Sequence, residues 1–141
     1  MRVKPLLPAL VLALACAPGV PVRVEVNRGA PVTALAFDLV PTGAGHANEV
    51  EMLRVTAGRE SPTGGGSGRF SKTYHHWILA RQRHAAGLSL PATVRYGETP
   101  PGYIAGQEPR GLSPGTYTVT VTMGQVESLA HFEVTSTGMI K

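Results

Sequence analysis

Apolar and polar residues alternate along most of the chain from position 22 onward, which is the pattern of half-buried β-strands. The first such run extends from Val22 to Val26. In the next one, Leu35, Phe37 and Leu39 share a face, so we expect the two runs to form an opening pair of strands. No window keeps the spacing of an amphipathic helix over three turns. The pattern therefore predicts an all-β protein.

The rest of the chain predicts further strands with turns between them. The run from Glu49 to Thr56 has an irregular phase that is typical of a β-bulge. The clearest strand, from Thr116 to Met123, directs alternate apolar residues inward and its threonines outward, and a tight turn at Gly124 leads into a terminal hairpin. The remaining segments are expected as strands at 70–79, 93–96 and 130–134, a helical turn within 80–89, and loops at 58–69 and 97–111.

Seven or eight short strands with turn signals between them indicate a single antiparallel β-sandwich, although a closed barrel fits the same pattern. The chain has 141 residues. About 120 remain after the first 21, which is enough for one core and therefore one domain.

The N-terminus has the pattern of a bacterial signal peptide. Arg2 and Lys4 precede an apolar stretch that ends at Cys16. That stretch is too short to cross about 30 Å of hydrocarbon as a helix, and Pro18 follows it closely. We expect a signal peptide at 1–15, a tether at 16–21 and the sandwich domain at 22–141, and therefore export from the cytoplasm.

The segment Ala13-Leu14-Ala15-Cys16 resembles the lipobox of bacterial lipoproteins. The resemblance implies that the Cys16 thiol is lipidated and anchors the protein to a membrane. It also implies the outer membrane, because Ala17 stands where such lipoproteins carry Asp when they stay at the inner membrane. The alternative is an ordinary cleavage site after Ala15 and a periplasmic or secreted domain. Cys16 is the only cysteine, so the chain cannot form an internal disulfide.

The segment from Leu112 to Val121, Leu-Ser-Pro-Gly-Thr-Tyr-Thr-Val-Thr-Val, resembles the corner before the penultimate strand of fibronectin type III and other immunoglobulin-like domains. Bacterial carboxypeptidase-regulatory-like modules carry a similar run. The resemblance implies that Tyr117 packs its ring into the core and bonds its hydroxyl to nearby backbone. Trp77 would then be the core tryptophan that such folds often keep.

Charge does not indicate a nucleic-acid partner. The formal net charge is +4, and removal of Arg2 and Lys4 with the leader leaves 11 basic and 9 acidic residues. The remaining basic residues are scattered, without the dense patch that nucleic-acid binding requires.

Candidate catalytic and metal-binding residues are few. The adjacent His75 and His76, with His46, His84 and His131, suggest a copper or zinc site. Adjacent strand residues point to opposite faces, which argues against both binding one ion. Asp38 is the only aspartate and lies in a core-like run. We expect no catalytic residues, no metal and no cofactor.

Aromatic residues suggest one further surface, because an exposed ring can stack on the apolar face of a sugar, although such residues more often belong to a core. The sequence therefore favours a non-enzymatic cell-envelope lipoprotein that acts as a protein-interaction or structural module with an unknown envelope protein. The alternatives are a secreted carbohydrate-binding module and, third, a periplasmic metal-binding protein. Edge strands of a small sandwich can also pair with another chain. The residues of the candidate sugar platform are Tyr74, Trp77, Tyr96 and Tyr103.

Overall fold

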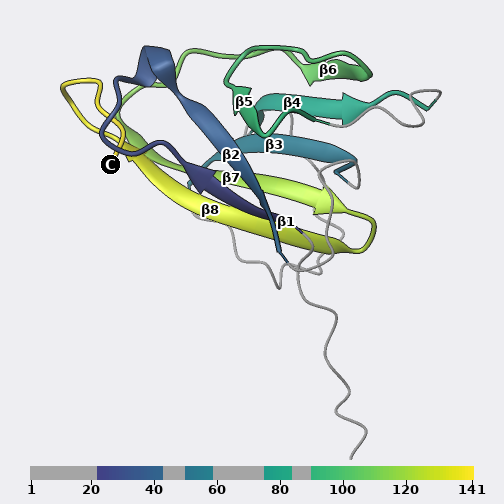
Figure 1. Ribbon diagram of the computed structural model, residues 1–141. Coiled ribbons are helices and arrows are strands. Elements are labelled where there is room, and N and C mark those ends of the chain that lie inside the picture. Colours follow the sequence, from purple (N-terminus) through teal and green to yellow (C-terminus); the bar gives the residue numbers. More distant parts are fainter. Residues whose placement is uncertain (1–21, 43–49, 59–74, 84–89) are drawn as a thin grey trace, which may run out of the picture.

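The computed structural model describes residues 22–42, 50–58, 75–83 and 90–141 (Figure 1). The expected signal peptide and tether lie outside the described residues. The described residues form eight strands and one 3-10 helix. In chain order these are β1 (Val22–Val26), η1 (Val32–Ala34), β2 (Ala36–Pro41), β3 (Met52–Ala57), β4 (His75–Arg81), β5 (Thr93–Arg95), β6 (Tyr103–Gln107), β7 (Gly115–Met123) and β8 (Val126–Val134).

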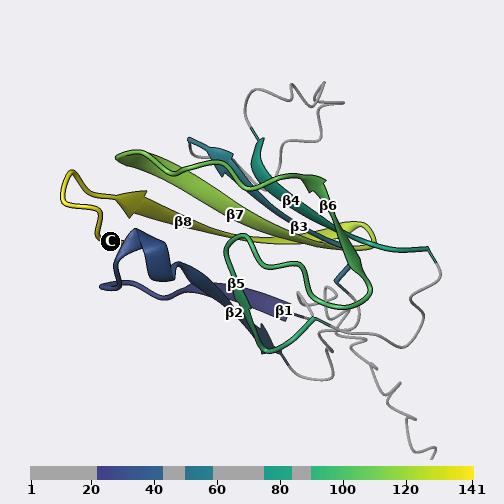
Figure 2. The ribbon, with the colours of Figure 1, turned by 90° about the horizontal axis from the view of Figure 1, so that it is seen from above.

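The strands form two antiparallel sheets that pack face to face (Figure 2). The smaller sheet has the order β1-β2-β5, and the larger has the order β6-β4-β3-β7-β8. The expected opening pair is confirmed, because Val24 of β1 lies opposite Leu39 of β2. The chain is thus an all-β sandwich of two open sheets rather than a closed barrel.

The core lies between the sheets and follows the alternation read from the sequence. Phe37 of β2 is at its centre: its ring centroid lies 6.5 Å from that of Trp77 and 6.1 Å from that of Phe132. Each large apolar side chain removed from water contributes about 1.5–3 kcal/mol, so this layer is the main source of stability. The other fully buried large side chains are Leu35, Leu53, Leu79, Ile140, Val22, Val50, Val55, Val94, Val119 and Val121.

The outer face of the larger sheet differs from the expectation. The threonines of β7 do point away from the core, but Thr118 and Thr120 are fully buried. Arg54 of β3 lies directly beside Thr120 in the register, and its side chain is only 12% exposed. The Arg54 guanidinium forms an ion pair with the Glu127 carboxylate of β8, with 3.4 Å between nitrogen and oxygen. A long side chain that lies along the sheet can cover short neighbours, because its apolar stem packs while its charged group is paired.

The irregular phase of the third run is confirmed as a bulge. The register shifts between Val55 and Thr56 of β3, which lie opposite Trp77 and His75 of β4. His76 is therefore the extra residue. Its ring meets the Tyr117 ring edge-on, with centroids 5.2 Å apart.

Two expectations about the middle of the chain were wrong. The helical turn expected within 80–89 does not form in its described part, because Ala80 and Arg81 continue β4 and pair with β6. Residues 84–89 lie outside the described residues, as do most of the loop at 58–69 and the start of the strand at 70–79. The segment 97–111 was expected to be loop, yet it contains β6. The prolines on either side of β6 hid a five-residue strand that completes the sheet edge.

The C-terminal residues join the two sheets at one end of the sandwich. Ile140 exchanges backbone hydrogen bonds with the β1–η1 connection, donating to Ala30 (2.8 Å) and accepting from Gly29 (2.7 Å). On its other side, Lys141 exchanges two bonds with Glu133 of β8, at 2.8 and 3.0 Å. Residues 139–141 therefore form a short strap, which we call the C-terminal strap. It closes the sandwich where η1 begins.

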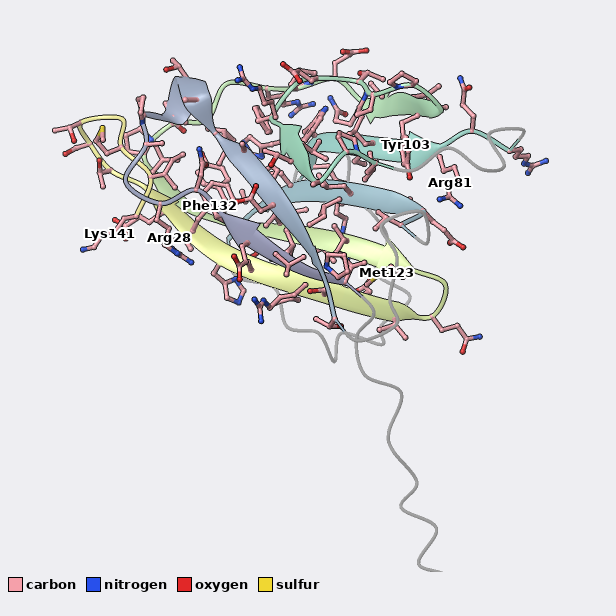
Figure 3. All side chains as sticks on the ribbon, viewed as in Figure 1. Arg28, Arg81, Tyr103, Met123, Phe132 and Lys141 are labelled. Carbon is pink, nitrogen blue, oxygen red and sulfur yellow. The ribbon has the colours of Figure 1, made fainter. Side chains whose placement is uncertain are left out.

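The two ends of the sandwich carry different parts of the chain. Along β2, Pro41 pairs with Val22 at one end, whereas Ala36 pairs with Arg95 at the other. Val22, the first described residue, and the residues after β5 therefore lie at opposite ends of β2, a strand length apart. Figure 3 shows the same separation, with Arg28 and Lys141 at the strap end and Tyr103 and Met123 toward the opposite end. Among the described residues, no helix has the length and apolar character needed to cross a membrane.

Candidate functional site

The structure separates the four residues of the candidate sugar platform. Trp77 is fully buried and Tyr103 is 4% exposed, so both belong to the core and the sugar-platform expectation is wrong for them. The Tyr103 hydroxyl donates to the Val50 carbonyl (2.7 Å) at the Val22 end. Tyr74 lies outside the described residues. Of the three described members of the platform, Tyr96 alone reaches the surface, half-buried at the strap end.

Tyr96 connects three segments at this end through its hydroxyl. The hydroxyl lies 3.1 Å from the His76 carbonyl oxygen of β4 and 2.7 Å from the Arg110 carbonyl oxygen. The Arg110 amide in turn donates to the same His76 carbonyl (2.8 Å). The Tyr96 ring meets the Trp77 ring edge-on, with centroids 5.1 Å apart. The backbone of Arg110 is thereby held at both its amide and its carbonyl.

The environment of Tyr96 keeps the hydroxyl protonated. Burial raises the pKa of Tyr96 from 10.0 to about 12, because a phenolate would lose hydration beside the core. The hydroxyl therefore remains a hydrogen-bond donor throughout the physiological pH range.

A second tyrosine fixes the chain just after this point. The Tyr117 hydroxyl donates to the Ser113 carbonyl (2.7 Å), four residues upstream, while its ring stacks on Phe132. This is the corner geometry that the Leu112 to Val121 segment predicted. The corner and the Tyr96 hydroxyl together hold the segment 110–113 in place.

These contacts line a hollow of about 260 Å³, which we call the Tyr96 hollow. Its wall is mostly apolar: Val32 of η1, the Tyr96 ring and Leu112 all pack against the core from its edge. Arg110 is exposed on its rim, and its guanidinium forms no ion pair with another described residue. A hollow of this kind can accept an apolar side chain while the guanidinium binds a carboxylate. The lining residues are Val32, Thr33, Tyr96, Arg110, Gly111 and Leu112.

The three histidines within the described residues do not gather around one point. His75 is 6% exposed and lies opposite Thr56 of β3, whereas His76 is the extra residue of the bulge. His46 and His84 lie outside the described residues. Within the described residues, no three metal-binding side chains come together. Asp38 is not in the core; it accepts a hydrogen bond from the Thr93 hydroxyl (2.7 Å) across β2 and β5.

His131 has a feature that the sequence reading missed. Its Nδ1 lies 3.0 Å from the Thr118 hydroxyl oxygen, and that hydroxyl donates to the Gly58 carbonyl at 2.7 Å. Because a hydroxyl has one hydrogen, it accepts from His131, whose Nδ1 must therefore carry the proton. In the neutral imidazole, Nε2 is then the nitrogen with the lone pair.

A second hollow, of about 270 Å³, lies beside His131. Glu133 lies two residues after His131 and therefore on the same face of β8. The sequence signal for the pair of His131 and Glu133 was this spacing of two residues. The hollow is polar, and its positive and negative side chains are mixed. It is lined by Arg28, Thr116, His131, Phe132, Glu133 and Lys141.

Sequence reasoning named Tyr96 but missed Arg110, Leu112 and Val32 as its neighbours. Arg110 is an isolated arginine in a proline-containing loop, and Val32 and Leu112 are single apolar residues in connecting segments. None of the three belongs to a periodic pattern. The comparisons with family models, curated proteins and solved structures found no match for this chain.

Proposed function

We propose that this protein is a non-enzymatic, lipid-anchored cell-envelope protein, and that it binds a partner protein through the Tyr96 hollow. The anchor is Cys16, six residues before the first strand. The proposal includes export and, following the lipobox resemblance, the outer membrane as the location.

The observation that carries the proposal is the position of the hollow relative to the start of β1. Val22 pairs with Pro41 at one end of β2, and the strand that leads to Tyr96 pairs with Ala36 at the other. A six-residue tether spans about 20 Å when extended. The anchor therefore holds one end of the sandwich near the membrane and leaves the Tyr96 hollow a strand length away, accessible to a protein partner.

The chemistry of the hollow favours an extended segment with an apolar side chain next to an acidic one. Val32, Tyr96 and Leu112 supply the apolar wall. Arg110 supplies the cation, and its backbone is already fixed by Tyr96 and His76. Less ordering is then needed when a carboxylate binds, which favours affinity.

Intact mass of the protein from its native membrane fraction tests the anchor. The expected result is a chain that begins at Cys16 with a mass increment equal to its lipid. An unmodified chain that begins at Ala17 or Cys16 would overturn the anchored part of the proposal and leave a secreted domain.

Chemical-shift titration tests the hollow independently of the anchor, with the exported chain carrying Cys16→Ser. The probes are a blocked tetrapeptide that carries Leu followed by Glu, and the same peptide with Gln in place of Glu. We expect the Glu peptide to shift the amides of Thr33 and Gly111, the Gln peptide to bind more weakly, and Arg110→Gln to abolish the difference. The control is Arg23→Gln, because Arg23 lies on β1 in an exposed pair with Glu25. Equal shifts with both peptides would contradict the role of Arg110.

A further inference from the structure

The two sheets have four edge strands, and three of them carry features that discourage pairing with another chain. β5 has only three residues. β6 is irregular, because its register with β4 shifts between Ile78 and Leu79. β1 is short and alternates charged residues with its buried valines. Short length, bulges and charges are the usual protections of a sheet edge.

The fourth edge, β8, is long and regular, and its first half carries a single charged residue, Glu127. It has nine residues, and its register with β7 runs without a shift from Gly115 opposite Val134 to Met123 opposite Val126. It contains neither proline nor lysine. The C-terminal strap covers it only from Glu133 onward.

The strap also shows which backbone groups of β8 point away from β7. Glu133 exchanges both of its backbone bonds with Lys141, so its amide and carbonyl point outward. Outward-pointing residues recur every second position along an antiparallel strand. The backbones of Glu127, Leu129 and His131 therefore point outward too. The His131 carbonyl accepts from the Arg28 guanidinium (2.7 Å), and a carbonyl oxygen can accept a second bond.

We propose that this edge pairs antiparallel with the same edge of a second copy of the chain, on a two-fold axis through Leu129. The register then places Glu127 opposite His131 of the second copy, and Leu129 opposite its own counterpart. All of these side chains lie on the outer face of the larger sheet. About six ladder hydrogen bonds join the two copies, because each of the three residues exchanges an amide and a carbonyl bond.

Charge and shape favour a second copy over an unrelated strand. A carboxylate meets an imidazole on both sides of the axis, and an apolar pair meets at its centre. On the inner side of the joined sheets, Ser128 of one copy faces Ala130 of the other, and both side chains are small. The Glu127 carboxylate is reachable, because its side chain is 32% exposed beside Arg54. An isologous interface needs such self-complementarity, and this stretch has it in one register.

The pairing goes beyond the proposed function and does not depend on Cys16. The Tyr96 hollow lies beside β5, at the opposite edge of the sandwich from β8, so the Tyr96 hollow of each copy stays open in the pair. The ladder is short compared with the interfaces of permanent dimers, so we expect a reversible, concentration-dependent association.

Sedimentation equilibrium of the exported chain carrying Cys16→Ser tests the pairing. We expect mass to rise from one chain toward two with concentration. Leu129→Pro removes an outward amide while leaving the β7 ladder intact, which edge strands tolerate. It is expected to weaken association at least about tenfold, because two ladder bonds are lost by symmetry. Leu129→Val, the matched control, keeps the amide and is expected to associate as the wild type does.

A second variant and a residue-specific measurement keep the test independent of whether the proline variant folds. Leu129→Lys places like charges opposite each other on the axis and is expected to abolish association. Hydrogen exchange is expected to show that the amides of Glu127 and Leu129 become protected as concentration rises. A monomer at millimolar concentration, association unchanged in both Leu129→Pro and Leu129→Lys, or protection elsewhere than β8 would each overturn the proposal.

Discussion

The Tyr96 hydroxyl lies 3.1 Å from the backbone carbonyl oxygen of His76, and this contact ties the end of the smaller sheet to the bulge of the larger one. The contact is made at the residue that the bulge adds to β4. The same carbonyl accepts the Arg110 amide (2.8 Å). One carbonyl of β4 thus holds both Tyr96 and Arg110 at the rim of the Tyr96 hollow.

Removal of that hydroxyl is expected to destabilise the protein and loosen the rim. Tyr96→Phe keeps the ring beside Trp77 but leaves the Arg110 carbonyl without its donor, which costs about 0.5–1.5 kcal/mol in the free energy of unfolding. Urea denaturation followed by circular dichroism measures the loss. Tyr103→Phe is the control, since it removes a hydroxyl bonded to the Val50 carbonyl at the far end. Only Tyr96→Phe is expected to weaken binding of the Glu peptide.

The same hydroxyl gives the stability a dependence on alkaline pH. The pKa of Tyr96 is about 12 in the folded protein against 10.0 for the free side chain, so the unfolded chain loses its proton first as pH rises. The stabilisation is complete below pH 10 and is lost as pH rises through 12. The difference in unfolding free energy between wild type and Tyr96→Phe should therefore shrink across this range. A constant difference would show that Tyr96 titrates normally.

Alternation along the chain was enough to predict most of the sandwich, because period-two burial is a local property. Thr116 to Met123 and the hairpin after it were placed correctly for this reason. The β6 strand was missed because it is an edge, where neither face must be fully apolar. Helix propensity at Ala80 and Arg81 was overridden by pairing with β6.

The candidate site was much less accessible to sequence reasoning than the fold. Aromatic residues were grouped by type, but Trp77 and Tyr103 belong to the core because of their position in the alternation. Among the described members of the group, only Tyr96 lies at the surface. Val32, Arg110 and Leu112 meet around it because three connections converge at one end of the sandwich. Such convergence depends on long-range pairing, so no local pattern predicts it.

The fluorescence of the tryptophan is expected to show directly that its side chain is buried. Trp77 is the single tryptophan, and it is fully buried between Phe37 and Tyr96. Its emission should be blue-shifted and resistant to quenching by iodide. Trp77→Ala is expected to cost about 3–5 kcal/mol through the cavity that it leaves. Emission that iodide quenches readily would contradict its place in the core and restore it as a surface residue for sugars.

The C-terminal strap is expected to contribute more stability than its length suggests. Ile140 is 2% exposed, and its backbone bonds join the strap to the β1–η1 connection. Ile140→Ala should cost about 2–5 kcal/mol, as for other buried aliphatic residues. Met139→Ala is the matched control, because Met139 is 37% exposed and its truncation should cost much less. Equal effects in thermal unfolding would mean that the strap does not pack as described.

The hydrogen bond between Thr118 and His131 leads to an expectation about a proton. Because the Thr118 hydroxyl donates to the Gly58 carbonyl, neutral His131 should carry its hydrogen on Nδ1 and leave Nε2 as an acceptor. Long-range nitrogen–proton NMR spectra distinguish the two tautomers.

Thr118→Val keeps the shape of the side chain but removes the hydroxyl, so the preference for the Nδ1 proton should be lost. It should also cost about 0.5–1.5 kcal/mol, the net contribution of a hydrogen bond, since the Gly58 carbonyl loses its donor. Thr116→Val is the control, because Thr116 lies on the same face of β7 but makes no such bond to His131 among the described residues. A wild-type protein in which neutral His131 carries its proton on Nε2 would show that the hydroxyl donates to the ring instead of accepting from it.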